Sequence, residues 1–168
     1  MWNDTDTPLA YLTTFRTYGT RLHGDPRGSV NRFRNQYGTR RLPEEQDWLE
    51  INASRMKREP VLLDGLRRSC VDEAIRETCE KRNWVLHAVN VRTNHAHSVA
   101  WIGDKSPGTA LNAFKANSTR LMRERGYWQS DRSPWADKGS TRYLWNEDSV
   151  RRAIDYVVFG QGDELPDF

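Results

Sequence analysis

The chain is poor in cysteine and has no long apolar run. Its two cysteines, Cys70 and Cys79, lie nine residues apart and form no CxxC pair. A disulfide framework and a cysteine-rich zinc site are therefore not expected, and a reducing cytoplasm is the expected setting. Uninterrupted apolar stretches span only a few residues, so neither a signal peptide nor a membrane-spanning segment is predicted.

The charge balance is close to even, with 26 basic residues against 23 acidic residues and a net charge of +3. A mildly basic chain of this kind is compatible with a nucleic-acid partner without requiring one. Seven tryptophans and six tyrosines are available either to fill a core or to stack on unpaired bases. The length of 168 residues predicts one domain, residues 1–168, with a hydrophobic core of its own.

Hydrophobic periodicity predicts an alternating series of strands and helices. Strands are expected at 10–20, 84–92, 95–103 and 141–145, and helices at 62–83, 107–125 and 147–159. A basic loop and a further helix form an insertion at about 20–60. Without it the order is β-α-β-β-α-β plus a terminal helix. This order predicts an α+β, ferredoxin-like fold, with an antiparallel sheet and helices on one face. Asn146 is placed to cap the last helix and Gly160 to end it.

Two of the four histidines stand on alternate positions of the predicted strand at 95–103. His95 and His97 therefore point to the same face, with Cβ atoms about 7 Å apart. Two imidazoles at this spacing can converge on one divalent cation if further ligands come from elsewhere, and oxygen ligands would favour Mg²⁺ or Mn²⁺. The alternative is a pair of surface histidines with no common ligand.

The last helix carries a tyrosine beside its apolar stripe. With Val150 as the origin of a helical wheel, Tyr156 falls about 120° away, next to Arg152. A tyrosine in this position is not needed for the core. It is either a surface residue that partly shields the sheet or a phenol available as a nucleophile.

These two motifs together resemble those of the single-tyrosine HUH transposases, which include the IS200-like and REP-associated tyrosine transposases. "TNHAHSVAW" is similar to the histidine–hydrophobic–histidine motif, and "AIDYVVFGQG" is similar to the tyrosine helix. The resemblance covers roughly residues 10–160. Two positions differ from the family pattern: Thr93 replaces the usual proline, and Gly160 stands where a third metal ligand is often found, with Gln161 one residue further on.

The resemblance implies a metal-dependent endonuclease and strand transferase that acts on single-stranded DNA beside hairpins. His95 and His97, with Gln161 as a third candidate, would hold Mg²⁺ or Mn²⁺. Tyr156 would attack the scissile phosphate and form a 5′-phosphotyrosine link, without a nucleotide cofactor. No membrane partner is implied, and association with the nucleoid is expected while DNA is bound. A homodimer is left open.

Basic side chains, together with the amide of Asn112, provide candidate DNA contacts at three places. The helix at 107–125 and the last helix contribute Asn112, Lys115, Arg120, Arg123 and Arg152, and the basic loop contributes Arg27, Arg32, Arg34, Arg40 and Arg41. A solvated charged face is the alternative for each.

Two other functions fit the same pattern. One is a relative that binds structured single-stranded DNA without cutting it. The other is an RNA-binding ferredoxin-like domain whose aromatic residues stack on bases, although the chain shows no convincing aromatic signature of that class.

Overall fold

The computed structural model describes residues 6–20 and 58–160. The chain divides into two compact units, one formed by Met1–Thr17 with Leu62–Phe168 and the other by Tyr18–Val61. Most of the second unit, and with it most of the predicted insertion at 20–60, lies outside the described residues. The first unit contains all the helices and strands described below.

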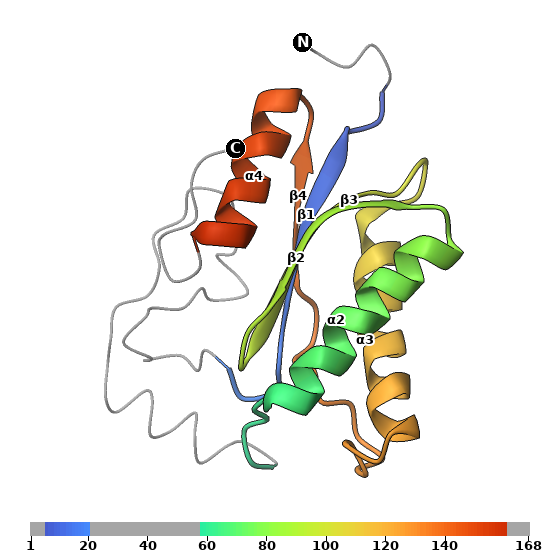
Figure 1. The fold of residues 1–168 in the computed structure, drawn as a ribbon, viewed down its shortest axis with the longest axis vertical. Coiled ribbons are helices and arrows are strands. Elements are labelled where there is room, and N and C mark those ends of the chain that lie inside the picture. The colour runs from blue at the N-terminus through green and yellow to red at the C-terminus, as the bar shows by residue number, and fades with distance from the viewer. Residues whose placement is uncertain (1–5, 21–57, 161–168) are drawn as a thin grey trace. The chain divides into compact units, whose positions relative to one another are not determined.

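Four described strands form one antiparallel sheet in the order β2-β3-β1-β4 (Figure 1). The elements in chain order are β1 (Ala10–Arg16), α2 (Gly65–Lys81), β2 (Val85–Val91), β3 (His95–Trp101), α3 (Pro107–Glu124), β4 (Ser140–Leu144) and α4 (Glu147–Phe159). The order of elements and of strands confirms the predicted α+β, ferredoxin-like fold. The short link between β2 and β3 makes them a hairpin, also as predicted.

Strand β1 is shorter than the predicted strand at 10–20. It ends at Arg16, and the bridge between Thr17 and Trp135 lies outside the strand. Two residues later Gly19 has a φ of +83°, a conformation that side chains rarely adopt. The run of Thr and aromatic residues therefore correctly predicts a strand, whereas its end is set by this turn.

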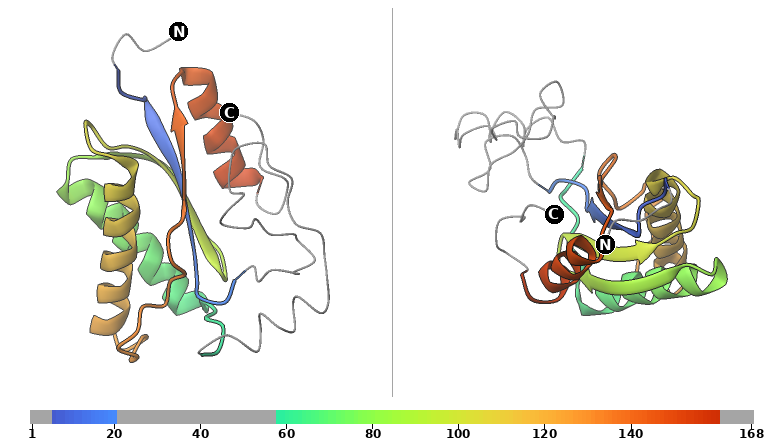
Figure 2. Two further views of the ribbon diagram at one scale, coloured as in Figure 1. Left: turned by 180° about the vertical axis from the view of Figure 1, so that it is seen from behind. Right: turned by 90° about the horizontal axis from the view of Figure 1, so that it is seen from above.

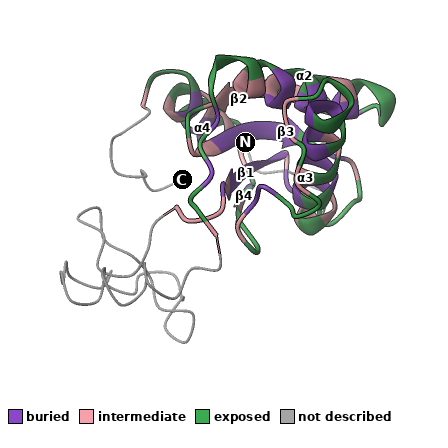
Figure 3. Cartoon of the chain, turned by 90° about the horizontal axis from the view of Figure 1, so that it is seen from below, coloured by how far each residue is buried: buried purple, intermediate pink, exposed green. Residues whose placement is uncertain are grey.

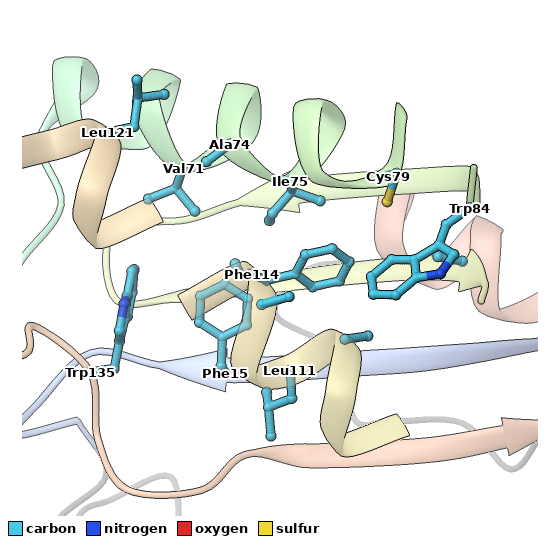
Figure 4. Close-up of a cluster of buried hydrophobic side chains, with 14 of the residues drawn as sticks. Phe15, Val71, Ala74, Ile75, Cys79, Trp84, Leu111, Phe114, Leu121 and Trp135 are labelled. Atoms are coloured by element: carbon cyan, nitrogen blue, oxygen red, sulfur yellow. The ribbon is translucent and has the colours of Figure 1, made fainter. Parts of the chain in front are cut away.

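Helices α2 and α3 cover one face of the sheet and enclose the larger core. Asp64 caps α2, because its carboxylate accepts a hydrogen bond from the backbone N–H of Arg67 at 2.9 Å. The core side chains in Figure 4 come from both helices and from the sheet, and Phe114 of α3 packs edge-on against Trp84 with ring centroids 6.2 Å apart. Cys70 and Cys79 are both free and buried here.

Helix α4 lies on the opposite face, as Figures 1 and 2 show. A second hydrophobic cluster joins it to the sheet, with Ala153 and Val157 of α4 against Leu12 and Val99. The predicted cap is confirmed, since the side chain of Asn146 accepts from the backbone N–H of Ser149 at 2.9 Å and Gly160 is the C-cap. Figure 3 shows that the central strands are buried between these helical layers.

Alternation along β3 decides which residues face which helix. Ala96 and Ala100 belong to the larger core, whereas Val99 belongs to the cluster beneath α4. The odd-numbered residues of β3, which include both histidines, therefore face α4. Among the helices that the structure describes, none combines the length and hydropathy needed to span a bilayer.

Candidate active site

The two histidines occupy the first and third positions of β3, an interior strand with β2 and β1 on either side. Their ring centroids are 4.7 Å apart, and the ring planes are inclined by 72°. His97 is 4% exposed, whereas His95 is half-buried. Two imidazoles are thus adjacent on the α4 face of the sheet, which is the arrangement that the HxH spacing predicts.

His97 is held by Thr14 on the neighbouring strand. The two residues are register partners in the β1–β3 ladder, and Oγ1 of Thr14 lies 2.7 Å from Nδ1 of His97 in a buried hydrogen bond. A hydrogen bond at Nδ1 fixes the orientation of the ring. Sequence reasoning missed Thr14, because its proximity to His97 depends on the register between strands far apart in the chain.

His95 is oriented by its own neighbour in the hairpin loop. Nδ1 of His95 lies 2.7 Å from Oδ1 of Asn94, and since an amide oxygen only accepts, this nitrogen donates. The loop is fixed in turn by β1 and its extension, because the backbone N–H of Thr17 donates to the carbonyl of Asn94 at 3.0 Å. In a neutral His95 ring with Nδ1 protonated, the lone pair is on Nε2.

Tyr156 reaches the histidines from α4. Its ring centroid is 5.4 Å from that of His97, with the planes inclined by 71°. The side chain is partly buried against the cluster beneath the helix, so the ring does not project freely into solvent. The adjacent backbone is tied to the sheet, since Nδ2 of Asn90 donates to the carbonyl of Val157 at 3.0 Å. The structure therefore brings all three rings together.

Gly160 leaves room for the tyrosine. A Cβ atom placed on Gly160 would lie 3.1 Å from both Cα and Cδ2 of Tyr156, closer than most real Cβ contacts. The helix stops here, and the backbone N–H of Gly160 donates to the carbonyl of Tyr156 at 3.0 Å. Gln161 is a candidate metal ligand only if the helix ends at Gly160, because a continued helix would put Gln161 on its apolar side. Gln161 itself lies outside the described residues.

His95 and His97 are the two candidate imidazole ligands for a cation. Within residues 6–20 and 58–160, no group of three or more His, Cys, Asp or Glu side chains is placed to hold a metal ion. A protein oxygen bonded to the other nitrogen of each imidazole is nevertheless the usual support of metal-binding histidines. Residues His95 and His97 thus fit two positions of a divalent site, and the remaining ligands would have to come from other groups.

Arg152 lies one helical turn before Tyr156 on α4. Its Nε is 3.3 Å from Oδ2 of Asp148, and the side chain is 49% exposed. An exposed ion pair of this kind contributes little to stability.

The predicted DNA contacts on α3 lie elsewhere. Helix α3 packs on α2 and on the face of the sheet opposite α4, so the structure does not bring its basic residues to Tyr156. Arg120 pairs with Glu124 at 2.9 Å, and Arg123 donates to the carbonyl of Ser130 at 3.1 Å. These contacts stabilise the helix and the following loop.

Lys115 and Asn112 differ in their surroundings. Nζ of Lys115 donates to the carbonyls of Ala136 and Lys138, and burial lowers the pKa of this ammonium. Its contacts anchor the loop before β4, a role that the sequence pattern did not indicate. Asn112 is exposed on α3. The loop residues Arg27, Arg32, Arg34, Arg40 and Arg41 lie outside the described residues.

Comparisons with known proteins bear on the family and the fold of the chain. A family model described as "Transposase IS200 like" matches residues 52–148, more than half of the chain. A solved REP-associated tyrosine transposase bound to a REP hairpin aligns with a TM-score of 0.52 and 12% identity over 95% of this chain and 71% of that chain. A protein described as a transposase from Deinococcus radiodurans R1 aligns over 98% of both chains with 12% identity and a TM-score of 0.49. No curated protein sequence matches the chain.

Proposed function

The chain belongs to the IS200-like transposase family, and from this premise we propose that it cuts and rejoins single-stranded DNA through Tyr156. The observation that carries the proposal is the cluster of three rings. His95 lies 4.7 Å from His97, which lies 5.4 Å from Tyr156, measured between ring centroids. A nucleophile beside a pair of candidate metal ligands is an arrangement that suits phosphoryl transfer.

In the proposed reaction the phenol oxygen of Tyr156 attacks the phosphorus of the scissile phosphate. A bond forms between this oxygen and phosphorus, the bond from phosphorus to the 3′ oxygen breaks, and the proton lost by the phenol is balanced by the one gained by the 3′-hydroxyl. The protein then carries a 5′-phosphotyrosine link. The 3′-hydroxyl of a second strand reverses the step by forming a new phosphodiester and restoring the phenol. The link conserves the energy of the phosphodiester, so no nucleotide cofactor is needed.

His95 and His97 would hold Mg²⁺ or Mn²⁺ through the nitrogens that Asn94 and Thr14 do not engage. When bound, such a cation polarises the scissile phosphate and offsets charge in the transition state. The chain's own contribution is orientation. Asn94 and Thr14 fix the two rings, and Asn90 fixes the end of α4 that bears the nucleophile. Holding reacting groups in place in this way is a large part of catalysis.

Arg152 is the nearest candidate for a phosphate contact on the same helix. It is one turn from Tyr156 and half-exposed. Its planar fork suits a phosphate oxygen pair, which would replace the ion pair with Asp148.

The experiment is incubation of the protein with labelled single-stranded DNA and Mn²⁺, followed by a denaturing gel. A band of protein covalently attached to DNA is expected, with hairpin-flanked strands reacting faster than unstructured strands and duplex reacting least. An unpaired strand bends into the site at low cost, whereas a duplex does not. Binding without any covalent band, with every one of these substrates, would contradict the enzyme and favour the binding-only relative.

A further inference from the structure

A groove of about 620 Å³ lies on the α4 face of the sheet, beside the first turns of that helix. Its walls are mainly apolar and include Val85 and Trp101 from the sheet and Ile154 from α4. Trp101 is 40% exposed and Val85 is 50% exposed, although both are large apolar side chains. Three polar side chains also line the groove, namely His87, Glu147 and Arg151.

The groove and the candidate active site are formed by the same two elements, β3 and α4. Trp101 is at the opposite end of β3 from His95 and follows the same alternation, so it faces α4 like both histidines. The rise along a strand puts Trp101 about 13 Å from His97. On α4, Ile154 precedes Tyr156 by two residues. A strand attached at Tyr156 therefore has only a short distance to run before it meets the groove.

The size of the groove favours a small ligand over a protein. Eight residues line it, whereas a stable protein interface takes roughly 20–30 residues from each partner. Pockets for small ligands are mostly apolar and contain a few polar groups that orient the ligand. A flat ring with hydrogen-bonding edges matches this combination of a tryptophan, aliphatic walls and three polar side chains.

The polar groups complement the edge of a nucleobase. Glu147 and Arg151 are separated by one helical turn, so an acceptor and a set of donors face the same side of α4. Partial desolvation lowers the pKa of His87, which favours the uncharged imidazole, with one donor and one acceptor nitrogen. We propose that the groove binds one unpaired nucleobase of the DNA strand, stacked on Trp101. The choice of a DNA strand as the source of this base rests on the proposed function.

The test separates base contacts from backbone contacts. The probes are fluorescein-labelled single strands of equal length, one of thymidine nucleotides and one fully abasic, titrated by anisotropy without divalent metal so that no cleavage occurs. The wild-type protein is expected to bind the thymidine strand more tightly. Trp101→Ala should weaken binding of this strand about tenfold and leave the abasic strand unchanged, because base–aromatic stacking is lost.

Matched variants complete the design. Trp145→Ala is the control, since Trp145 is 39% exposed, lies outside the groove and stacks on Tyr143. It should bind both strands like the wild type. Val85→Phe fills the groove from an exposed strand position and should remove the preference for bases in the same way as Trp101→Ala.

Each result has one interpretation. Loss of base preference in Trp101→Ala and Val85→Phe, but not in Trp145→Ala, supports binding of a nucleobase in the groove. Equal weakening of both strands by Trp101→Ala, or no weakening in either groove variant, overturns it. The covalent assay with Mn²⁺ is measured separately, so failure of the cleavage chemistry is distinguishable from failure of the base site.

Discussion

The hydroxyl of Thr14 lies 2.7 Å from Nδ1 of His97 within the buried part of the sheet. Thr14→Val has nearly the same shape but no hydroxyl, so it leaves a buried ring nitrogen without this partner. We expect the free energy of unfolding to fall by about 1–3 kcal/mol in a urea titration. We also expect Mn²⁺ affinity to fall about tenfold to a hundredfold, as it does when groups that orient metal-binding histidines are removed.

Thr14→Ser is the control for this change, because it keeps the hydroxyl and loses only a methyl group. It should restore most of the Mn²⁺ affinity. Equal Mn²⁺ affinity in the wild type and in Thr14→Val would show that the hydroxyl does not position His97.

Tyr156→Phe removes the proposed attacking oxygen and retains the ring that packs edge-on against His97. We expect the covalent protein–DNA band to disappear, with unchanged urea denaturation and unchanged DNA affinity. Tyr143→Phe is the matched control, since Tyr143 is 50% exposed on β4 and stacks on Trp145. A covalent band that persists in Tyr156→Phe would identify another nucleophile.

The double variant His95→Ala, His97→Ala tests the cation site directly. Calorimetry with Mn²⁺ should show heat of binding for the wild type and none for the variant, because both imidazole ligands are gone. DNA affinity should change little, since phosphate contacts supply most of it. His87→Ala is the control for the Mn²⁺ titration alone, because His87 lies on β2 in the groove rather than at the ring cluster. Undiminished Mn²⁺ binding by the double variant would rule out this pair as the site.

Gly160→Ala tests the space beside the proposed nucleophile, Tyr156. The added methyl would press on Tyr156 from 3.1 Å, and a displaced nucleophile reacts slowly. We expect covalent attachment to slow by about tenfold to a hundredfold. Gly108→Ala adds the same methyl on α3, where no atom lies within 4 Å, and should leave the rate unchanged. An unaltered rate in Gly160→Ala would mean that the ring has room to adjust.

Burial raises the pKa of the Cys79 thiol to about 11. A thiol-specific reagent at pH 8 should therefore modify Cys79 only slowly in the folded protein and quickly in urea, with mass spectrometry to locate the label. Because the folded pKa is raised, the associated stability is fully present below about pH 9 and is lost as the pH rises towards 11. Rapid labelling of Cys79 without denaturant would contradict this burial.

The local features of the fold were predictable, because they depend on residues close together in sequence. Alternation in "HAHSVAW" places His95 and His97 on one face, and Asn146 and Gly160 mark the two ends of α4. The pairing of Thr14 with His97 was not predictable, since it depends on how β1 and β3 align. The partners of Arg120 show the same difficulty, because its contact with Glu77 of α2 at 3.8 Å depends on how two helices pack, and the predicted phosphate contact of Arg120 stays a prediction.

The two hydrophobic clusters lie on opposite faces of one sheet. The rings of His95, His97 and Tyr156 are on the face that carries the smaller cluster, beneath α4. Tyr156 and His95 lie outside the larger cluster, in which α2 and α3 pack against the sheet. Selection for the proposed chemistry and selection for folding therefore act on partly separate sets of residues, with Thr14 subject to both because it contacts His97 within the buried sheet. A descendant gene released from the first of these pressures would accumulate changes around α4 and still encode a folded protein, which gives this architecture an evolutionary route from enzyme to structural or regulatory component.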